Sequence, residues 1–182
     1  MRNNDRDYEL TLPRRRGQMF SRLAVVLMTA ALTGCNTVTT NQYEATALVS
    51  LTWQVKYSLN LATDKNPRIE KFVSNSLLNR NGVKPQGAVI GPDEHNLWWP
   101  TLPPQPTAIE IEQRKRSNEQ ASTPEMLRNV KYQLSYSVNN QAVTLPTNYD
   151  VYREAVNAHA SQRPLQLTLG VNNSSVQKAE PR

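Results

Sequence analysis

The sequence predicts an α+β fold, in which a small, mainly antiparallel sheet carries helices on one face. Two observations lead to this class. Apolar and polar residues alternate over 43–61 and again over 130–138, which is typical of strands with one buried face. Three other segments have helical periodicity or helix-capping residues, and they separate the strands along the chain. This order of elements favours an antiparallel sheet covered by helices.

The first strand and the first helix are predicted in the segment that follows residue 42. Tyr43–Leu61 has an apolar residue at every odd position, so it is expected to be one long strand. Asp64–Gly82 changes period and is expected to be a helix, with Asn81-Gly82 as its left-handed stop. Its predicted buried face consists of Ile69, Phe72, Val73, Ser76 and Leu77.

The middle of the chain is predicted to be a long loop followed by polar, helical turns. Val83–Pro106 is rich in proline and glycine and has no regular period, and loops of this length are usually functional or disordered. Thr107 and Glu110 form a capping box, so a helix is expected to run to about Gln120. A further short turn or helix is expected at Thr123–Glu125.

The last third is predicted to contain a hairpin, a helix and a strand. Val130–Val138 alternates, and Asn139-Asn140 can turn the chain back into Gln141–Leu145. Tyr149–Ala160 is expected to be a helix, and Leu165–Val171 the last strand. The domain organisation is therefore a leader over 1–34, a tether over 35–42, an α+β domain over 43–171 and a disordered tail over 172–182.

The leader has the features of a secretory signal peptide. An apolar run from Leu23 to Leu32 follows Arg14, Arg15, Arg16 and Arg22. This run fits the roughly 7–15 residues of a signal-peptide core, and it is shorter than the about 20 residues that a membrane-spanning helix needs.

The leader ends in Leu32-Thr33-Gly34-Cys35, which resembles the lipobox of bacterial prolipoproteins. The resemblance implies that the Cys35 thiol receives a diacylglyceryl group and that the leader is cleaved between Gly34 and Cys35. In most Gram-negative bacteria, the α-amino group of the cysteine that cleavage exposes, here Cys35, is also acylated. Two or three acyl chains hold a protein at a membrane, whereas one chain anchors it only marginally. The alternative is an uncleaved core helix with a buried free cysteine.

Three further features concern export and location. The twin arginine Arg15-Arg16 lacks the nearby Phe-Leu of the twin-arginine export motif, which favours general secretion. Met19 begins a compact leader of its own, so translation could start there or at Met1. By resemblance to the enteric sorting rule, Asn36 after the lipidated cysteine points to the outer membrane, facing the periplasm.

Composition excludes several classes of function. The chain of 182 residues has a net charge of +6, and half of this charge lies in residues 1–35, so the mature part has no basic block for nucleic acid. Cys35 is the only cysteine, and once it carries lipid no disulfide, cysteine nucleophile or cysteine-based metal site is available. No cofactor-binding motif is present in the sequence, so no cofactor is expected.

Two clusters in the long loop are candidate sites. Asp93-Glu94-His95 combines metal-capable side chains, but adjacent residues rarely all face one ion, which favours a solvated turn over a metal site. Trp98-Trp99-Pro100 is either a lid folded onto the sheet or a contact surface for a partner. The paired tryptophans could also enter a membrane interface.

These observations favour a lipid-anchored cell-envelope lipoprotein with a non-catalytic interaction or assembly domain. Its expected partners are membrane lipid, through Cys35, and an envelope protein, through Trp98, Trp99 and Pro100. The alternative is a binder of a small ligand or cell-wall fragment in a cleft. A hydrolase would need His95 or His159 beside a serine or carboxylate, and no nucleophile motif accompanies either.

Overall fold

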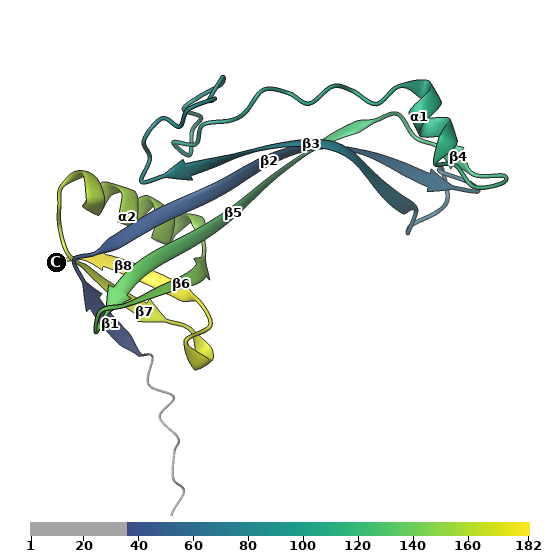
Figure 1. The fold of residues 1–182 in the computed structure, drawn as a ribbon. Coiled ribbons are helices and arrows are strands. Elements are labelled where there is room, and N and C mark those ends of the chain that lie inside the picture. The colour runs from purple at the N-terminus through teal and green to yellow at the C-terminus, as the bar shows by residue number, and fades with distance from the viewer. Residues whose placement is uncertain (1–35) are drawn as a thin grey trace, which may run out of the picture. The chain divides into compact units, whose positions relative to one another are not determined.

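A computed structural model describes residues 36–182, which form two antiparallel sheets (Figure 1). The larger sheet has the order β3-β2-β5-β6, with β4 paired to β2, and the smaller has the order β1-β7-β8. Strands hold 48% of these residues and helices 14%, so the fold is a small α+β or mainly β one. The strands are β1 (Thr37–Thr40), β2 (Tyr43–Ser58), β3 (Arg68–Arg80), β4 (Gln120–Ala121), β5 (Glu125–Val138), β6 (Gln141–Thr147), β7 (Leu165–Leu169) and β8 (Val176–Pro181).

β2 is a long strand with one buried face, as the alternation of its sequence predicts, and it lies inside the larger sheet between β3 and β5. It pairs with β3 on one side and with β5 on the other over most of its length. Its odd positions face the core, and all but two of them are buried. The strand ends at Ser58, three residues before the predicted end at Leu61, because the chain turns there through Asn60 towards β3.

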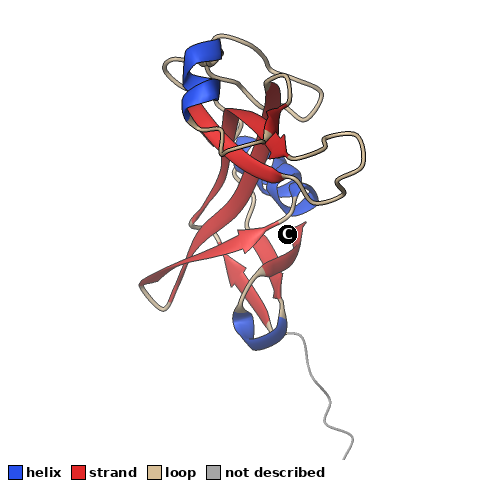
Figure 2. Cartoon of the chain, turned by 90° about the vertical axis from the view of Figure 1, so that its right-hand side faces the viewer, coloured by secondary structure: helices blue, strands red, loops and turns tan. Residues whose placement is uncertain are grey.

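The helix predicted over Asp64–Gly82 is wrong, because Arg68–Arg80 forms strand β3, which is labelled in Figure 1 and is one of the strands drawn red in Figure 2. β3 pairs antiparallel with β2, and a bulge places two residues, Phe72 and Val73, opposite Trp53. An extra residue in a strand shifts its alternation by one position, so the apolar residues before and after the bulge imitate helical spacing. The left-handed stop is present at Asn81 and Gly82, with φ of 47° and 70°, but it ends a strand.

The elements that follow the long loop are shorter than predicted, or different. Helix α1 (Ala108–Gln113) has the predicted capping box between Thr107 and Glu110, but it ends seven residues before the expected Gln120. Residues 123–125 are not a separate turn or helix, because β5 begins at Glu125 and continues the pairing with β2.

The predicted hairpin and second helix are both present. Asn139 and Asn140 have φ of 49° and 61°, and they connect β5 to β6. Helix α2 (Tyr149–Ala160) has the predicted bounds and is capped by the Asn148 side chain, which accepts a hydrogen bond from the main-chain N of Val151. Its buried side chains are Val151, Tyr152, Ala155 and Ala158, and it packs against β2 and β8, one strand from each sheet.

Both ends of the described chain differ from the prediction. The expected tether over 36–42 contains β1, which pairs with β7 from Thr37 onwards. The expected disordered tail over 172–182 contains β8, which pairs with the other side of β7. The last predicted strand ends at Leu169, and Val171 begins a short 3-10 turn. Short, polar strands are stabilised by the neighbour they pair with, so their own sequences predict them poorly.

The core joins the two sheets through α2 and part of the long loop. Among residues 36–182, no helix is long and apolar enough to cross a membrane. The predicted signal peptide, the predicted cleavage site at Gly34 and the predicted lipidation site at Cys35 all lie outside the described residues. The main buried cluster consists of Ala45, Ala47, Val49, Leu51, Leu97, Trp99, Leu134, Tyr136, Val151, Tyr152, Ala155, Ala158, Leu165, Leu167, Leu169, Val176 and Ala179.

At the end of the larger sheet where β3 begins, Arg68 and Glu119 form an ion pair. The Arg68 guanidinium donates from Nε and Nη2 to the two Glu119 oxygens, at 3.2 and 2.6 Å, and it lies over the Tyr57 ring. The hydrogen bonds from Arg68 are the main reason that the pKa of Glu119 falls to about 2. This bidentate pair fastens the segment before β4 to the start of β3.

This ion pair predicts a specific loss of stability in acid. The folded state lowers the pKa of Glu119 from 4.5 to about 2, so its contribution is present above about pH 4.5 and is lost as the pH falls towards 2. Glu119→Gln should therefore flatten the decline in the free energy of unfolding over this range. Urea titrations of both proteins at several pH values would measure it, and identical slopes would contradict the prediction.

Candidate interaction surface

The Trp98-Trp99-Pro100 segment is packed against the core along most of its length. Trp99 is 8% exposed, Pro100 is buried, and the preceding Leu97 is 1% exposed. Trp98 is half-buried, and the Lys84 ammonium lies 5.2 Å from its ring centroid. The burial of Trp99 and Pro100 favours the lid interpretation for these two residues, and Trp98 keeps an accessible part.

Asp93 fixes the conformation of the loop before the tryptophans. Its Oδ1 accepts hydrogen bonds from the main-chain N of His95 and of Leu97, both at 2.9 Å, and its Oδ2 accepts one from Trp99 Nε1 at 2.7 Å. Burial opposes ionisation of this carboxyl, but the hydrogen bonds outweigh it and lower the pKa of Asp93 below its ordinary value. The carboxylate is therefore engaged in holding Trp99 in place.

The metal-capable cluster that begins at Asp93 does not converge on one point. Within residues 36–182, no group of three or more histidine, cysteine or acidic side chains is arranged to hold a metal ion. His95 Nδ1 lies 3.7 Å from Glu94 Oε1, and the His95 ring packs edge-on against Tyr149. His159 packs edge-on against Tyr43. Neither histidine side chain donates to or accepts from a serine or carboxylate in the described part of the chain.

Asn79 holds the main chain of Trp98, although no sequence motif marks this residue. Its buried Oδ1 accepts from the main-chain N of Trp98 at 2.8 Å, and its Nδ2 donates to the Trp98 carbonyl at 3.0 Å. Asn75, four residues earlier on β3, donates to the Thr101 carbonyl at 2.9 Å. Two asparagines on one strand therefore bind the loop over 98–101, a pattern hidden by the helical reading of this segment.

β3, the strand that carries both asparagines, is an edge strand of the larger sheet. β3 ends the order of the larger sheet, so only one of its sides pairs with another strand. The main-chain N of Asn81 donates to the Ala45 carbonyl at 2.8 Å. Because antiparallel pairs alternate, Asn79, Leu77 and Asn75 bond to β2, and the N–H and C=O groups of Leu78, Ser76 and Ser74 point outwards.

This open edge, Ser74–Leu78, lacks the usual protection against pairing. Ser74, Ser76 and Leu78 are all exposed, and residues 72–79 contain neither a proline nor a charged side chain. Native proteins usually protect exposed edges with such residues. On either side of this stretch the edge is partly occupied, because the Lys71 carbonyl accepts from Arg114 and the Arg80 carbonyl accepts from the main-chain N of Val83. The open edge can thus accept a further strand.

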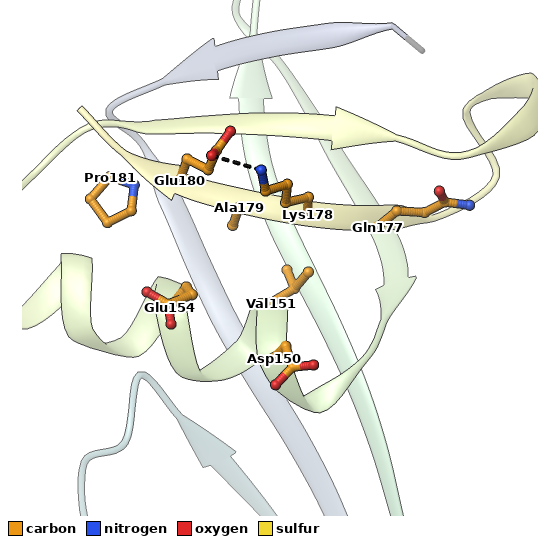
Figure 3. Close-up of a pocket in the computed structure, with 8 residues that line it drawn as sticks. All are labelled: Asp150, Val151, Glu154, Gln177, Lys178, Ala179, Glu180 and Pro181. Carbon is orange, nitrogen blue, oxygen red and sulfur yellow. Dashed lines mark ion pairs between the residues drawn. The ribbon is translucent and has the colours of Figure 1, made fainter. Parts of the chain in front are cut away.

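A groove between α2 and β8 is a second candidate (Figure 3). It has a volume of about 330 Å³ and an apolar floor that includes Val151 and Ala179. Lys178 Nζ lies 2.7 Å from Glu180 Oε1, and the Arg153 guanidinium is shared between Glu154 and Asp150, at 3.2 and 3.6 Å. The groove therefore offers a small apolar surface beside charged side chains that take part in ion pairs, and its lining does not include Trp98 or Trp99.

In comparisons with known proteins, no family model, no curated protein and no solved structure matches this chain.

Proposed function

We propose that this protein is a lipid-anchored lipoprotein of the bacterial cell envelope, whose folded domain binds a protein partner and has no catalytic role. The anchor rests on the signal peptide and on Leu32-Thr33-Gly34-Cys35. Its favoured location is the periplasmic face of the outer membrane, from Asn36 after the lipidated cysteine.

The open edge of β3 supports the binding role. A partner segment in extended conformation would pair with the outward N–H and C=O groups of Ser74, Ser76 and Leu78. Main-chain hydrogen bonds of this kind supply affinity, and side chains on alternate positions supply specificity. Since Asn79 and Asn75 hold residues 98–101 beside β3, the accessible part of Trp98 would flank the added strand.

Proline in place of Ser76 is expected to abolish partner binding and to leave the domain folded. The Ser76 N–H points away from β2, so its loss removes no bond of the sheet, and prolines are tolerated at such edge positions. A photo-crosslinking amino acid at Ser74, in the native membranes, should give a discrete protein adduct. Ser76→Pro should remove this adduct with little change in the melting temperature.

Three variants complete this test. Ser76→Ala keeps the N–H and should retain the adduct, whereas Leu77→Pro loses a bond to β2 and should destabilise the domain. A crosslinker at Leu59, which is 69% exposed at the end of β2, should not give the same adduct. Persistence of the Ser74 adduct in folded Ser76→Pro protein would rule out strand addition at β3.

The alternative, binding of a small ligand or cell-wall fragment, is favoured by one observation, the apolar floor of the groove between α2 and β8. A crosslinker at Gln177, on the wall of this groove, separates the two functions. Adducts with glycan or peptide fragments at Gln177, unaffected by Ser76→Pro, would support the alternative.

A further inference from the structure

The residue next to the proposed lipid anchor is fixed to a turn of the smaller sheet. The Asn36 carbonyl accepts from the main-chain N of Leu169 at 2.8 Å, and Asn36 Nδ2 donates to Asn173 Oδ1 at 2.9 Å. Asn173 belongs to the turn Gly170–Ser175, which connects β7 to β8. Figure 1 shows this turn beside the start of β1. Asn36 and the turn therefore lie side by side on one surface.

We propose that this surface, Asn36 together with the turn Gly170–Ser175, rests on the phospholipid bilayer, with Val171 in the headgroup region. The proposal depends on the lipidation of Cys35 proposed above. Consecutive Cα atoms are about 3.8 Å apart, so the lipid-bearing residue is a single peptide unit from the fixed Asn36. With the acyl chains in the bilayer, so short a connection brings the surrounding surface to the headgroups.

The chemistry of the turn fits this position. Val171 is 78% exposed, the largest exposed fraction among the exposed large apolar side chains of the described chain. The side chains of Asn172 and Asn173 offer amide N–H groups that can donate to phosphate and ester oxygens, and the Ser174 hydroxyl donates to the Val171 carbonyl at 2.8 Å. Neither the turn nor β1 contains a charged side chain, so no carboxylate faces anionic headgroups. An apolar tip flanked by neutral polar groups suits the membrane interface better than it suits open water.

The end of the larger sheet next to α1 provides an internal control, because it lies far from Asn36. β2 starts at Tyr43, soon after β1, and its 16 residues span about 50 Å at about 3.3 Å per residue. Near its end, the Tyr57 hydroxyl donates to the Ile111 carbonyl of α1 at 2.9 Å. Ile109, on the same helix, is 71% exposed. A probe at Ile109 thus matches one at Val171 in exposure but lies far from Asn36.

Fluorescence quenching in vesicles tests the proposal. Lipid consumes the thiol of Cys35, the only cysteine of the chain, so Val171→Cys or Ile109→Cys supplies a unique site for a fluorophore. The lipidated protein is inserted into phosphatidylethanolamine–phosphatidylglycerol vesicles that contain spin-labelled phospholipid. The label at residue 171 should be quenched several-fold more strongly than the label at residue 109. The same label at residue 171 on Cys35→Ala protein should not be quenched.

The possible failures can be told apart by intact mass. If the mass shows a lipidated protein and both labels are quenched equally, the proposal of a bilayer-facing surface is wrong, whereas the proposed lipid anchor is supported. If the mass shows an unmodified Cys35, both the anchor and the surface are overturned. Equal melting temperatures of the two labelled proteins would exclude a difference caused by unfolding.

Discussion

Cys35→Ala is expected to leave the protein without lipid and to release it from membranes. The thioether to diacylglycerol requires the Cys35 sulfur, and alanine offers no nucleophile. Each buried methylene contributes about 0.8 kcal/mol to membrane binding, so the loss of two or three acyl chains should remove essentially all retention. Membrane fractionation and intact-mass spectrometry of the native product measure the two effects.

Asn36→Ala serves as the control for this variant, since it changes the neighbouring residue and leaves the four residues of the lipobox intact. It should still be lipidated. Unchanged membrane retention of Cys35→Ala would contradict the proposed lipid anchor. A native product that begins ahead of Gly34 and lacks the added mass of acyl chains would contradict it as well.

Trp99→Ala is expected to destabilise the domain by about 3–5 kcal/mol, the usual range for removal of a buried aromatic side chain. Trp99 is part of the main buried cluster, and its Nε1 donates to the Asp93 carboxylate. Truncation leaves a cavity beneath the loop and removes a hydrogen-bond donor from a partly buried carboxylate. Urea denaturation followed by circular dichroism measures the free energy of unfolding.

Trp98→Ala is the matched control, because Trp98 is half-buried and its main chain, not its ring, is bound by Asn79. It should cost much less stability and should weaken partner capture. If Trp99→Ala melted like the parent protein and lost the partner, Trp99 would be a contact residue and the lid interpretation would fail.

Elements with an uninterrupted pattern could be predicted from the sequence. β2 alternates over its whole length, and α2 has a cap, a buried face and a clear end, so both were predicted close to their bounds. The Asn139-Asn140 turn was predicted because asparagine tolerates positive φ. In each case the local sequence and the tertiary environment favour the same conformation.

The remaining elements depend on partners that the local sequence does not reveal. The bulge in β3 shifts its alternation, and β1 and β8 are polar strands whose conformation is set by pairing with β7. The candidate edge at Ser74–Leu78 has no signal of its own in the sequence, because the shifted alternation of β3 imitates the spacing of a helix. Asn79 had no signal of its own, because its role arises from a loop that returns to it 19 residues later.

If the protein is exported as proposed, the place of β7 between the two ends of the described chain sets an order of folding events. Thr37 pairs with Thr168, and Thr40 pairs with Leu165, so these contacts join residues more than 120 positions apart. On a route that threads the polypeptide through the inner membrane from its amino end, β1 emerges early and β7 emerges near the last. On the proposed route, β1, next to the proposed lipidation site, would stay unpaired until translocation is nearly complete. Such distant pairing slows folding and leaves the emerging chain exposed to aggregation for longer.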